Sequence, residues 1–252
     1  MEGIMAGDGL LWWHWLLIYL LVFVATVVQA SIGFGFGLFA APILMIWFPQ
    51  LLPGPLLVAS FSLTITMSVR GWRWVRLDAI FWMIAGVLPG LWIGAQLMQH
   101  LAPHPMAILF GLLVLTAVAL SASGHHPPVI PATLFPAGVC AAVMAVTTTM
   151  SGPPVALVLQ NLPGAWFRHT LALFFSLTGL LTMASLALIE RMGWPELSAG
   201  LALIPPVLAG FLLARHVNPW LDQRRQLLRL LILTVAGAAG VVVMVRAWLT
   251  WP

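Results

Sequence analysis

Charged side chains are scarce in this sequence. They make up only 6% of its 252 residues, whereas 62% of the residues are apolar. So few polar side chains cannot cover the surface of a soluble protein of this length. The composition therefore excludes a soluble protein. The apolar residues form long runs without strand-like alternation, which excludes a transmembrane barrel and predicts an all-α integral membrane protein.

Lysine is absent, and the ten basic residues are all arginine, divided among several loops. No basic stripe interleaves with aromatic residues, so the predicted partner is the lipid bilayer and no nucleic acid is expected. The first ten residues contain no basic residue. The first apolar run therefore lacks the positive segment of a cleaved signal peptide, and we expect it to be retained. The single cysteine, Cys140, cannot form an internal disulfide.

Acidic residues are missing from the middle of every apolar run. Asp78, Glu190, Glu196 and Asp222 all lie at the ends of runs or in loops. Cation or proton exchange commonly uses a carboxylate within the membrane, so this distribution argues against a buried acid relay. We predict no metal or cofactor site and no enzymatic activity.

The chain repeats itself once, with an offset that drifts slowly along the sequence. Matched pairs include Pro49 with Pro163, Ser62 with Ser176, Pro89 with Pro205, and Gly94 with Gly210. The repeat predicts an N-terminal half over residues 1–124, a linker over 125–131 and a C-terminal half over 132–252.

Each half is predicted to contain a helical hairpin, broken by glycine or proline, followed by three spanning helices. The hairpins cover 10–49 and 132–162; the spans cover 55–69, 77–98 and 106–122 in the first half, and 170–189, 197–214 and 227–249 in the second. The short segment 155–162 cannot cross the membrane, because a helix of that length rises about 12 Å against a hydrocarbon core of about 30 Å. It is expected to return from inside the membrane.

The arginines predict that the two halves are inverted in the membrane. With the N-terminus outside, only Arg191 and Arg246 fall in outer segments. The cytoplasmic segments then hold Arg70, Arg73, Arg76, Arg168, Arg215, Arg224, Arg225 and Arg229. Because cytoplasmic loops carry an excess of basic residues, we predict that both termini lie outside.

Inverted repeats with broken helices are typical of secondary transporters, whose substrates bind where the two breaks meet near the midplane. The predicted substrate-binding residues are Gln29, Ser31, Gly33, Gly35 and Gly37 at the first break, and Thr147, Thr148, Thr149, Ser151, Gly152 and Pro153 at the second. At an offset of 114, Gly33 corresponds to Thr147, Gly35 to Thr149, and Gly37 to Ser151. Exposed amides at helix N-termini, together with hydroxyl donors, favour a small anion as the substrate.

The glycine-rich stretch 33–42, paired with Ser151-Gly152-Pro153-Pro154-Val155, resembles the TauE/SafE family of membrane permeases, known as sulfite exporters. The second break departs from the usual glycine-rich motif of that family, since it contains three threonines at 147–149. The resemblance implies a multi-pass protein of the bacterial inner membrane. It also implies transport of a sulfur-containing or organic anion such as sulfite, sulfoacetate or another sulfonate.

The sequence therefore favours a transporter that moves a small anion by alternating access around the two breaks. A passive anion channel would share the same site. Two further readings are an intramembrane serine hydrolase, suggested by the order of residues 149–152, and a membrane scaffold without transport. The sequence leaves open the direction of transport, the coupling ion and whether the protein forms a homo-oligomer.

The inverted arrangement gives a topology that labelling can test. Single cysteines introduced between Arg70 and Arg76 should react only with reagents that reach the cytoplasm, because that loop carries three of the inward-facing arginines. Cysteines at Leu52 to Gly54 should react from outside. Labelling of the 70–76 loop from outside would contradict the predicted orientation.

Overall fold

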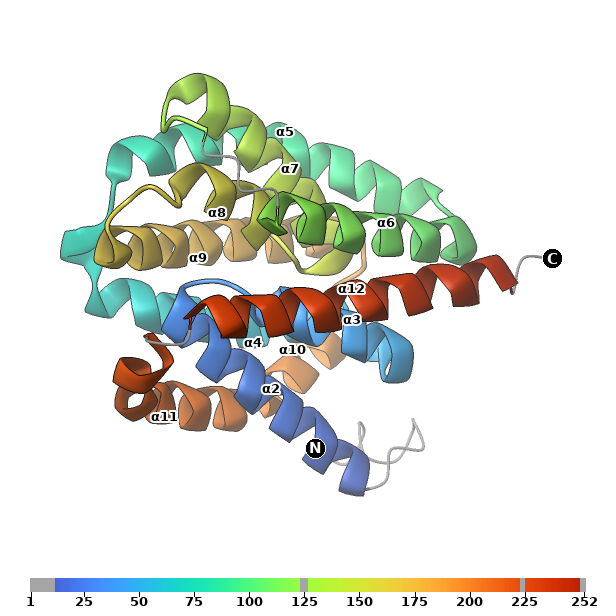
Figure 1. Cartoon of the computed structure of the whole chain (residues 1–252). Coiled ribbons are helices and arrows are strands. Elements are labelled where there is room, and N and C mark those ends of the chain that lie inside the picture. Colours follow the sequence, from blue (N-terminus) through green and yellow to red (C-terminus); the bar gives the residue numbers. More distant parts are fainter. Residues whose placement is uncertain (1–11, 123–126, 223–224, 250–252) are drawn as a thin grey trace.

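The structure is a computed structural model that describes residues 12–122, 127–222 and 225–249. Every regular element within these residues is a helix (Figure 1). The all-α fold predicted from the composition is therefore confirmed. The predicted linker 125–131 falls partly outside the described residues.

The described residues of the first half form five α-helices and two short 3-10 turns. They are α2 (Trp12–Ile32), α3 (Phe36–Trp47), η1 (Pro49–Leu51), α4 (Gly54–Arg70), η2 (Trp72–Trp74), α5 (Leu77–His100) and α6 (Pro103–Ala122). The second half contains α7 (Pro131–Thr148), α8 (Gly152–Leu159), α9 (Gly164–Leu188), α10 (Trp194–Ala202), α11 (Ile204–Asp222) and α12 (Arg225–Leu249).

The span predicted over 197–214 consists of two consecutive helices. They are α10 and α11, which are separated at Leu203 and together are long and apolar enough to cross a membrane. Pro205 and Pro206 follow at once, and neither has an amide hydrogen to continue the helical ladder. In the first half a single proline, Pro89, is accommodated inside an unbroken α5. Two adjacent prolines therefore break the segment that one proline leaves continuous.

Glycines on α5 let this helix pack closely on α7. A Cβ atom on Gly86 would overlap the backbone of Phe135, and one on Gly90 or Gly94 would meet the stretch 139–146 farther along α7. Small residues four apart allow such close backbone approach between membrane helices. Residues later in α5 contact residues later in α7, so the two helices run parallel and begin on the same side of the protein.

The helices α2 and α10–α11 pack in the same parallel way. The Tyr19 hydroxyl donates to the Ala202 carbonyl over 2.9 Å, and farther along Gly210 packs against Phe23 and Thr26. The helices α2 and α10 therefore begin on one common side.

The two hairpins open on opposite sides of the protein. The Arg76 amide, at the start of α5, donates to Thr170 near the start of α9, so α7 and α9 begin together and the α7–α8 hairpin opens on that side. Gly54, at the start of α4, packs against Glu196 in the first turn of α10. The α2–α3 hairpin therefore opens at the other end of α9 (Figure 1).

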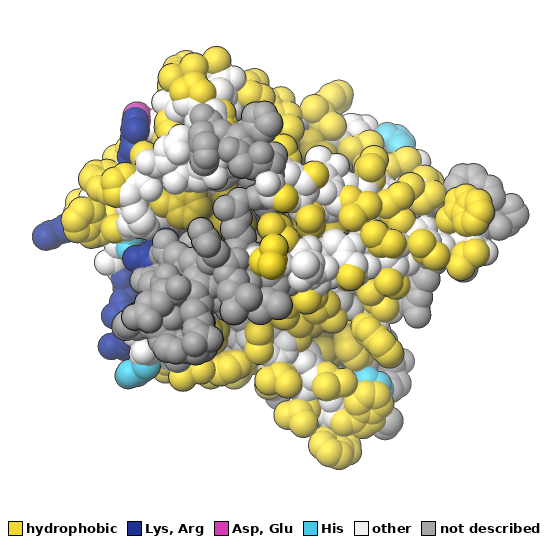
Figure 2. All heavy atoms as spheres, viewed as in Figure 1, with side chains coloured by type: hydrophobic (Ala, Val, Ile, Leu, Met, Phe, Trp, Pro, Cys, Tyr) yellow, Lys and Arg dark blue, Asp and Glu magenta, His cyan; other side chains and the backbone are white. Residues whose placement is uncertain are grey.

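The outer surface suits a bilayer. By length and composition, five stretches of helix among the described residues could cross a bilayer: Trp12–Ile32, Leu77–His100, Pro131–Thr148, Gly164–Leu188 and the combined Trp194–His216. Apolar side chains cover most of the visible surface, and the visible arginines gather along one edge (Figure 2). The side chains of Arg224, Arg225, Arg229 and Arg246 lie outside the described residues.

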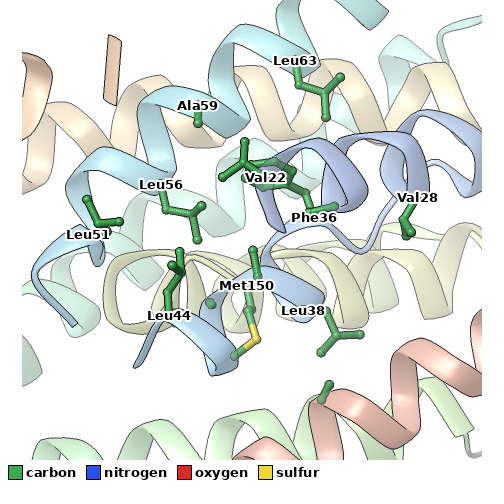
Figure 3. Packing of buried hydrophobic residues seen from close by; sticks show 14 of the residues in the cluster. Val22, Val28, Phe36, Leu38, Leu44, Leu51, Leu56, Ala59, Leu63 and Met150 are labelled. Atoms are coloured by element: carbon green, nitrogen blue, oxygen red, sulfur yellow. The ribbon is translucent and has the colours of Figure 1, made fainter. Parts of the chain in front are cut away.

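The core joins the two hairpins. Met150, at the second break, is 1% exposed and lies among Phe36, Leu38 and Leu44 of α3 (Figure 3). This packing holds the short helix α3 against the opposite half of the chain.

Alanine substitutions at two helical glycines should distinguish the stability lost by disturbing close packing from the stability gained through helix propensity. Gly86→Ala should destabilise the protein by about 1–3 kcal/mol, because the added methyl would overlap the Phe135 carbonyl. Gly179→Ala is the matched control, since its Cβ would have no neighbour closer than 3.9 Å. The unfolding midpoints of the purified variants in one detergent provide the measurement, and equal midpoints would contradict the α5–α7 packing.

Candidate functional site

The two helix breaks have the same backbone plan. Gly33 follows α2 with φ 101° and Thr149 follows α7 with φ 61°, so both residues adopt a left-handed conformation. The helices α3 and α8 then begin at Phe36 and Gly152. For a β-branched residue this conformation is an outlier that costs about 1–3 kcal/mol, so the surrounding structure must hold Thr149 in place.

The equivalences predicted between the two breaks were wrong by two residues. In the structure the common offset is 116, because Gly33 and Thr149 share the left-handed conformation and the return helices begin at Phe36 and Gly152. The offset of 114 came from matches that lie farther along the chain, and the two copies have drifted between these points.

Gln29 closes the first break. The backbone amide of Phe36, the first residue of α3, donates to Gln29 Oε1 over 2.9 Å, and Gln29 is 3% exposed. Because the carboxamide oxygen accepts this bond, the orientation of the group is fixed. Its nitrogen remains as a donor, and Gln29 lies in the wall of the cavity described next.

The two breaks touch each other and enclose a small cavity. A Cβ atom on Gly37 would overlap the Thr149 carbonyl, so only glycine permits this approach. The cavity is small, since the centre of a water molecule can occupy about 20 Å³ of it. Its lining consists of Gln29, Phe34, Gly35, Gly37, Leu38, Ser60, Thr149, Met150, Ser151, Gly152, Pro153 and Phe175.

Four residues predicted to bind substrate lie outside this lining: Ser31, Gly33, Thr147 and Thr148. The hydroxyls of Ser31, Thr147 and Thr148 donate to carbonyls one turn earlier, at 2.7 to 2.8 Å. A hydroxyl near a helix end competes for such carbonyls, and its only proton is then used. Gly33 packs instead against Arg168 of α9.

The Thr148 side chain supports the second break from inside. Its oxygen also accepts a bond from the Met150 amide at 3.3 Å, and the residue is fully buried. The Thr149 hydroxyl donates to the Thr148 carbonyl at 2.6 Å. The three threonines therefore satisfy backbone groups of the break and do not offer hydroxyl protons to the cavity.

Two serine hydroxyls at the cavity differ from their neighbours. On α4, the hydroxyls of Ser62, Thr66 and Ser68 each donate to a carbonyl of their own helix at 2.7 Å. Within the described part of the chain, the hydroxyls of Ser60 and Ser151 have no hydrogen-bond partner, and both residues line the cavity. Sequence reasoning missed Ser60, because nothing in the pattern distinguishes it from the other hydroxyl residues of α4.

Aromatic side chains close the cavity toward α9. Phe34 and Phe175 line it, and Phe34 makes an edge contact with Phe167, their ring centroids being 6.3 Å apart. Sequence analysis did not assign Phe34, Leu38, Met150 or Phe175 to the site. Apolar residues in apolar runs carry no signal that separates a site wall from the core.

The cavity wall is electrically neutral in its side chains. Among the described residues, none that lines it is acidic, basic or a histidine. No group of His, Cys, Asp and Glu in the described chain is arranged to hold a metal ion. Any ligand must therefore be held by amides, hydroxyls and apolar contacts.

Comparison with known protein families gives a match over most of the chain. The chain matches the family described as sulfite exporter TauE/SafE over residues 18–243. It belongs to the TauE/SafE family. No curated protein and no solved structure matches it. The TauE/SafE match includes both breaks and every residue that lines the cavity, and it agrees with the resemblance read from the glycine-rich stretch.

Gln29 should be needed for the stability of the first break. Gln29→Leu would leave the buried Phe36 amide without an acceptor, and we expect a loss of about 1–3 kcal/mol. Gln96→Leu is the control, because the Gln96 side chain pairs with the exposed His100. Thermal unfolding without added anion measures both variants. Equal losses would show that the Gln29 bond has no special role.

Proposed function

We propose that this protein is a secondary transporter that carries a small anion across the membrane by alternating access around the cavity between the two breaks. The observation that carries the proposal is that the N-terminal ends of α3 and α8 both face this one cavity. A helix N-terminus combines unpaired amide donors with a partial positive charge, and so favours an anion.

The first break supplies mainly backbone donors. The Phe36 amide is taken by Gln29, and the Phe39 amide donates to the Gly35 carbonyl. The amides of Gly37 and Leu38 lie between them in the first turn of α3, where no helical partner exists. Both residues line the cavity.

The second break supplies donors differently. Pro153 and Pro154 have no amide hydrogen, so the first turn of α8 presents few backbone donors. The Ser151 hydroxyl stands immediately before this turn, and the Ser60 hydroxyl reaches the same cavity from α4. Together with the Gln29 carboxamide, they would replace part of the water shell of an oxyanion.

The arrangement of the helices supports alternating access. Two broken hairpins that open on opposite sides, with a site where their breaks meet, are the layout of transporters built from inverted repeats. In this proposal residues 1–124 and 132–252 form the two repeats. The arginine-rich edge faces the cytoplasm of a bacterial cell, and both termini lie outside.

The substrate class rests on the family. TauE/SafE proteins are described as sulfite exporters, and sulfite, sulfoacetate and other sulfonates present oxygen acceptors that suit amide and hydroxyl donors. The intramembrane hydrolase finds no support at the cavity, because no described residue in its wall could act as a base toward Ser151. A passive channel would use the same donors and differs only in lacking coupled exchange.

Serine substitutions test the site. Ser151→Ala and Ser60→Ala should each weaken anion binding by about ten- to a hundredfold, because a hydrogen bond to a charged partner contributes about 1.5–3 kcal/mol. Ser62→Ala should have no effect, since its hydroxyl donates to the Ala59 carbonyl. Calorimetric titration of the purified variants with sulfite measures the affinities. If all three variants bind like the parent, the cavity is not the site.

Counterflow tests the transport mode. In vesicles that contain only this protein and are loaded with unlabelled sulfite, labelled sulfite should accumulate transiently against its gradient. A channel allows equilibration but no such accumulation. Ser151→Leu should abolish the signal, because the larger side chain would occupy the cavity.

A further inference from the structure

The neutral side chains of the cavity wall limit the negative charge of an anion that the cavity can bind. All the described residues of the wall are neutral, and the donors that face it are amides, a carboxamide and two hydroxyls. The N-terminus of α3 adds roughly half a positive charge, and that of α8 adds less, because Pro153 and Pro154 have no amide hydrogen. The site thus offers less than one unit of positive charge, without any ionised side chain.

A second negative charge would be poorly compensated here. The electrostatic penalty for moving an ion from water into a less polar site rises with the square of its charge, so a dianion pays about four times the penalty of a monoanion of equal size. The stabilisation that neutral donors give to an ion rises only roughly in proportion to the charge of the ion. These donors can therefore offset the penalty of one negative charge more readily than the penalty of two.

The ionisable groups on the helices that form the wall lie outside the lining. On α9, the side chain of Arg168 packs against Gly33, and His169 contacts the Met67 carbonyl. On α4, Arg70 lies over the Phe211 ring. The helices α3 and α8 contain no ionisable side chain, α7 contains only the exposed Cys140, and His14 lies near the distant start of α2.

We propose, on the basis of the transport function above, that this site selects monoanions: it takes hydrogen sulfite and sulfonates with one charge, and rejects the sulfite dianion and sulfate. Sulfite loses its second proton near neutral pH, so the transported form would decline as the pH rises. The protonation of the substrate, rather than of a side chain, would then set the pH dependence.

Binding of three anions to the purified protein across neutral pH tests this proposal. Methanesulfonate carries one charge throughout the range, sulfate carries two, and sulfite changes from one to two. We expect constant affinity for methanesulfonate, no measurable binding of sulfate, and a sulfite affinity that falls by about tenfold for each pH unit above the sulfite pKa.

The outcomes separate this inference from the proposed function. If sulfate binds as tightly as methanesulfonate, or if sulfite affinity stays constant, charge selection is wrong while anion transport stands. If methanesulfonate affinity falls in parallel with sulfite affinity, a protein group titrates and the inference is again overturned. If none of the three anions binds, the proposed function itself fails.

A charge-adding variant supplies an independent test. Ser60→Lys would place a cation at the cavity wall and should make sulfate binding measurable. Ser62→Lys is the matched control on the same helix, outside the lining, and should leave the preference unchanged. An equal gain in both variants would contradict local charge selection. If Ser60→Lys does not fold, the pH series on the parent protein decides the question.

Discussion

The fold depends on satisfying the backbone groups that two broken helices leave unpaired in the buried interior of the protein. An unpaired amide or carbonyl in that environment costs several kcal/mol, so irregular backbone survives there only where the protein supplies partners. At the first break the Gln29 side chain accepts the Phe36 amide. At the second, the Thr148 side chain accepts the Met150 amide. Each break thus carries its own side-chain acceptor on the helix that precedes it, and the two breaks are then packed against each other.

The same constraint explains why the two breaks differ in composition. The first uses glycines, which enter left-handed conformations without strain and let Gly37 approach the opposite backbone. The second holds Thr149 in a left-handed conformation and begins its return helix with prolines. Donors that could face a ligand are therefore unequally shared: amides come from α3, whereas α8 is preceded by a serine hydroxyl. The two breaks are thus similar in backbone conformation, but the donors that they present to the cavity differ.

The sequence was sufficient for features that depend on composition and on glycine or proline. The scarcity of charge predicted a helical membrane protein, and the glycine and proline clusters located both breaks. The sequence was insufficient to show which hydroxyl groups face the cavity, because the same side chain can bond to its own helix or to a ligand. The hydroxyls of Thr147 and Ser60 have the same chemistry, yet the first donates to its own helix and the second lies at the cavity. The helix register and the position of the neighbouring elements decide this choice, and neither is encoded in a local pattern.

Neutral donors also bear on how an anion could leave the site. A buried arginine would hold an oxyanion through charge-assisted bonds that are about twice as strong as neutral ones, and each transport cycle would have to break them. Amides and hydroxyls give weaker individual bonds, and they are divided between two breaks that belong to different halves of the chain. If the halves move relative to each other, as alternating access requires, the donors from α3 and those beside α8 separate. The ligand then loses the Ser151 hydroxyl, which is the donor from the C-terminal half, in the same movement that opens the cavity.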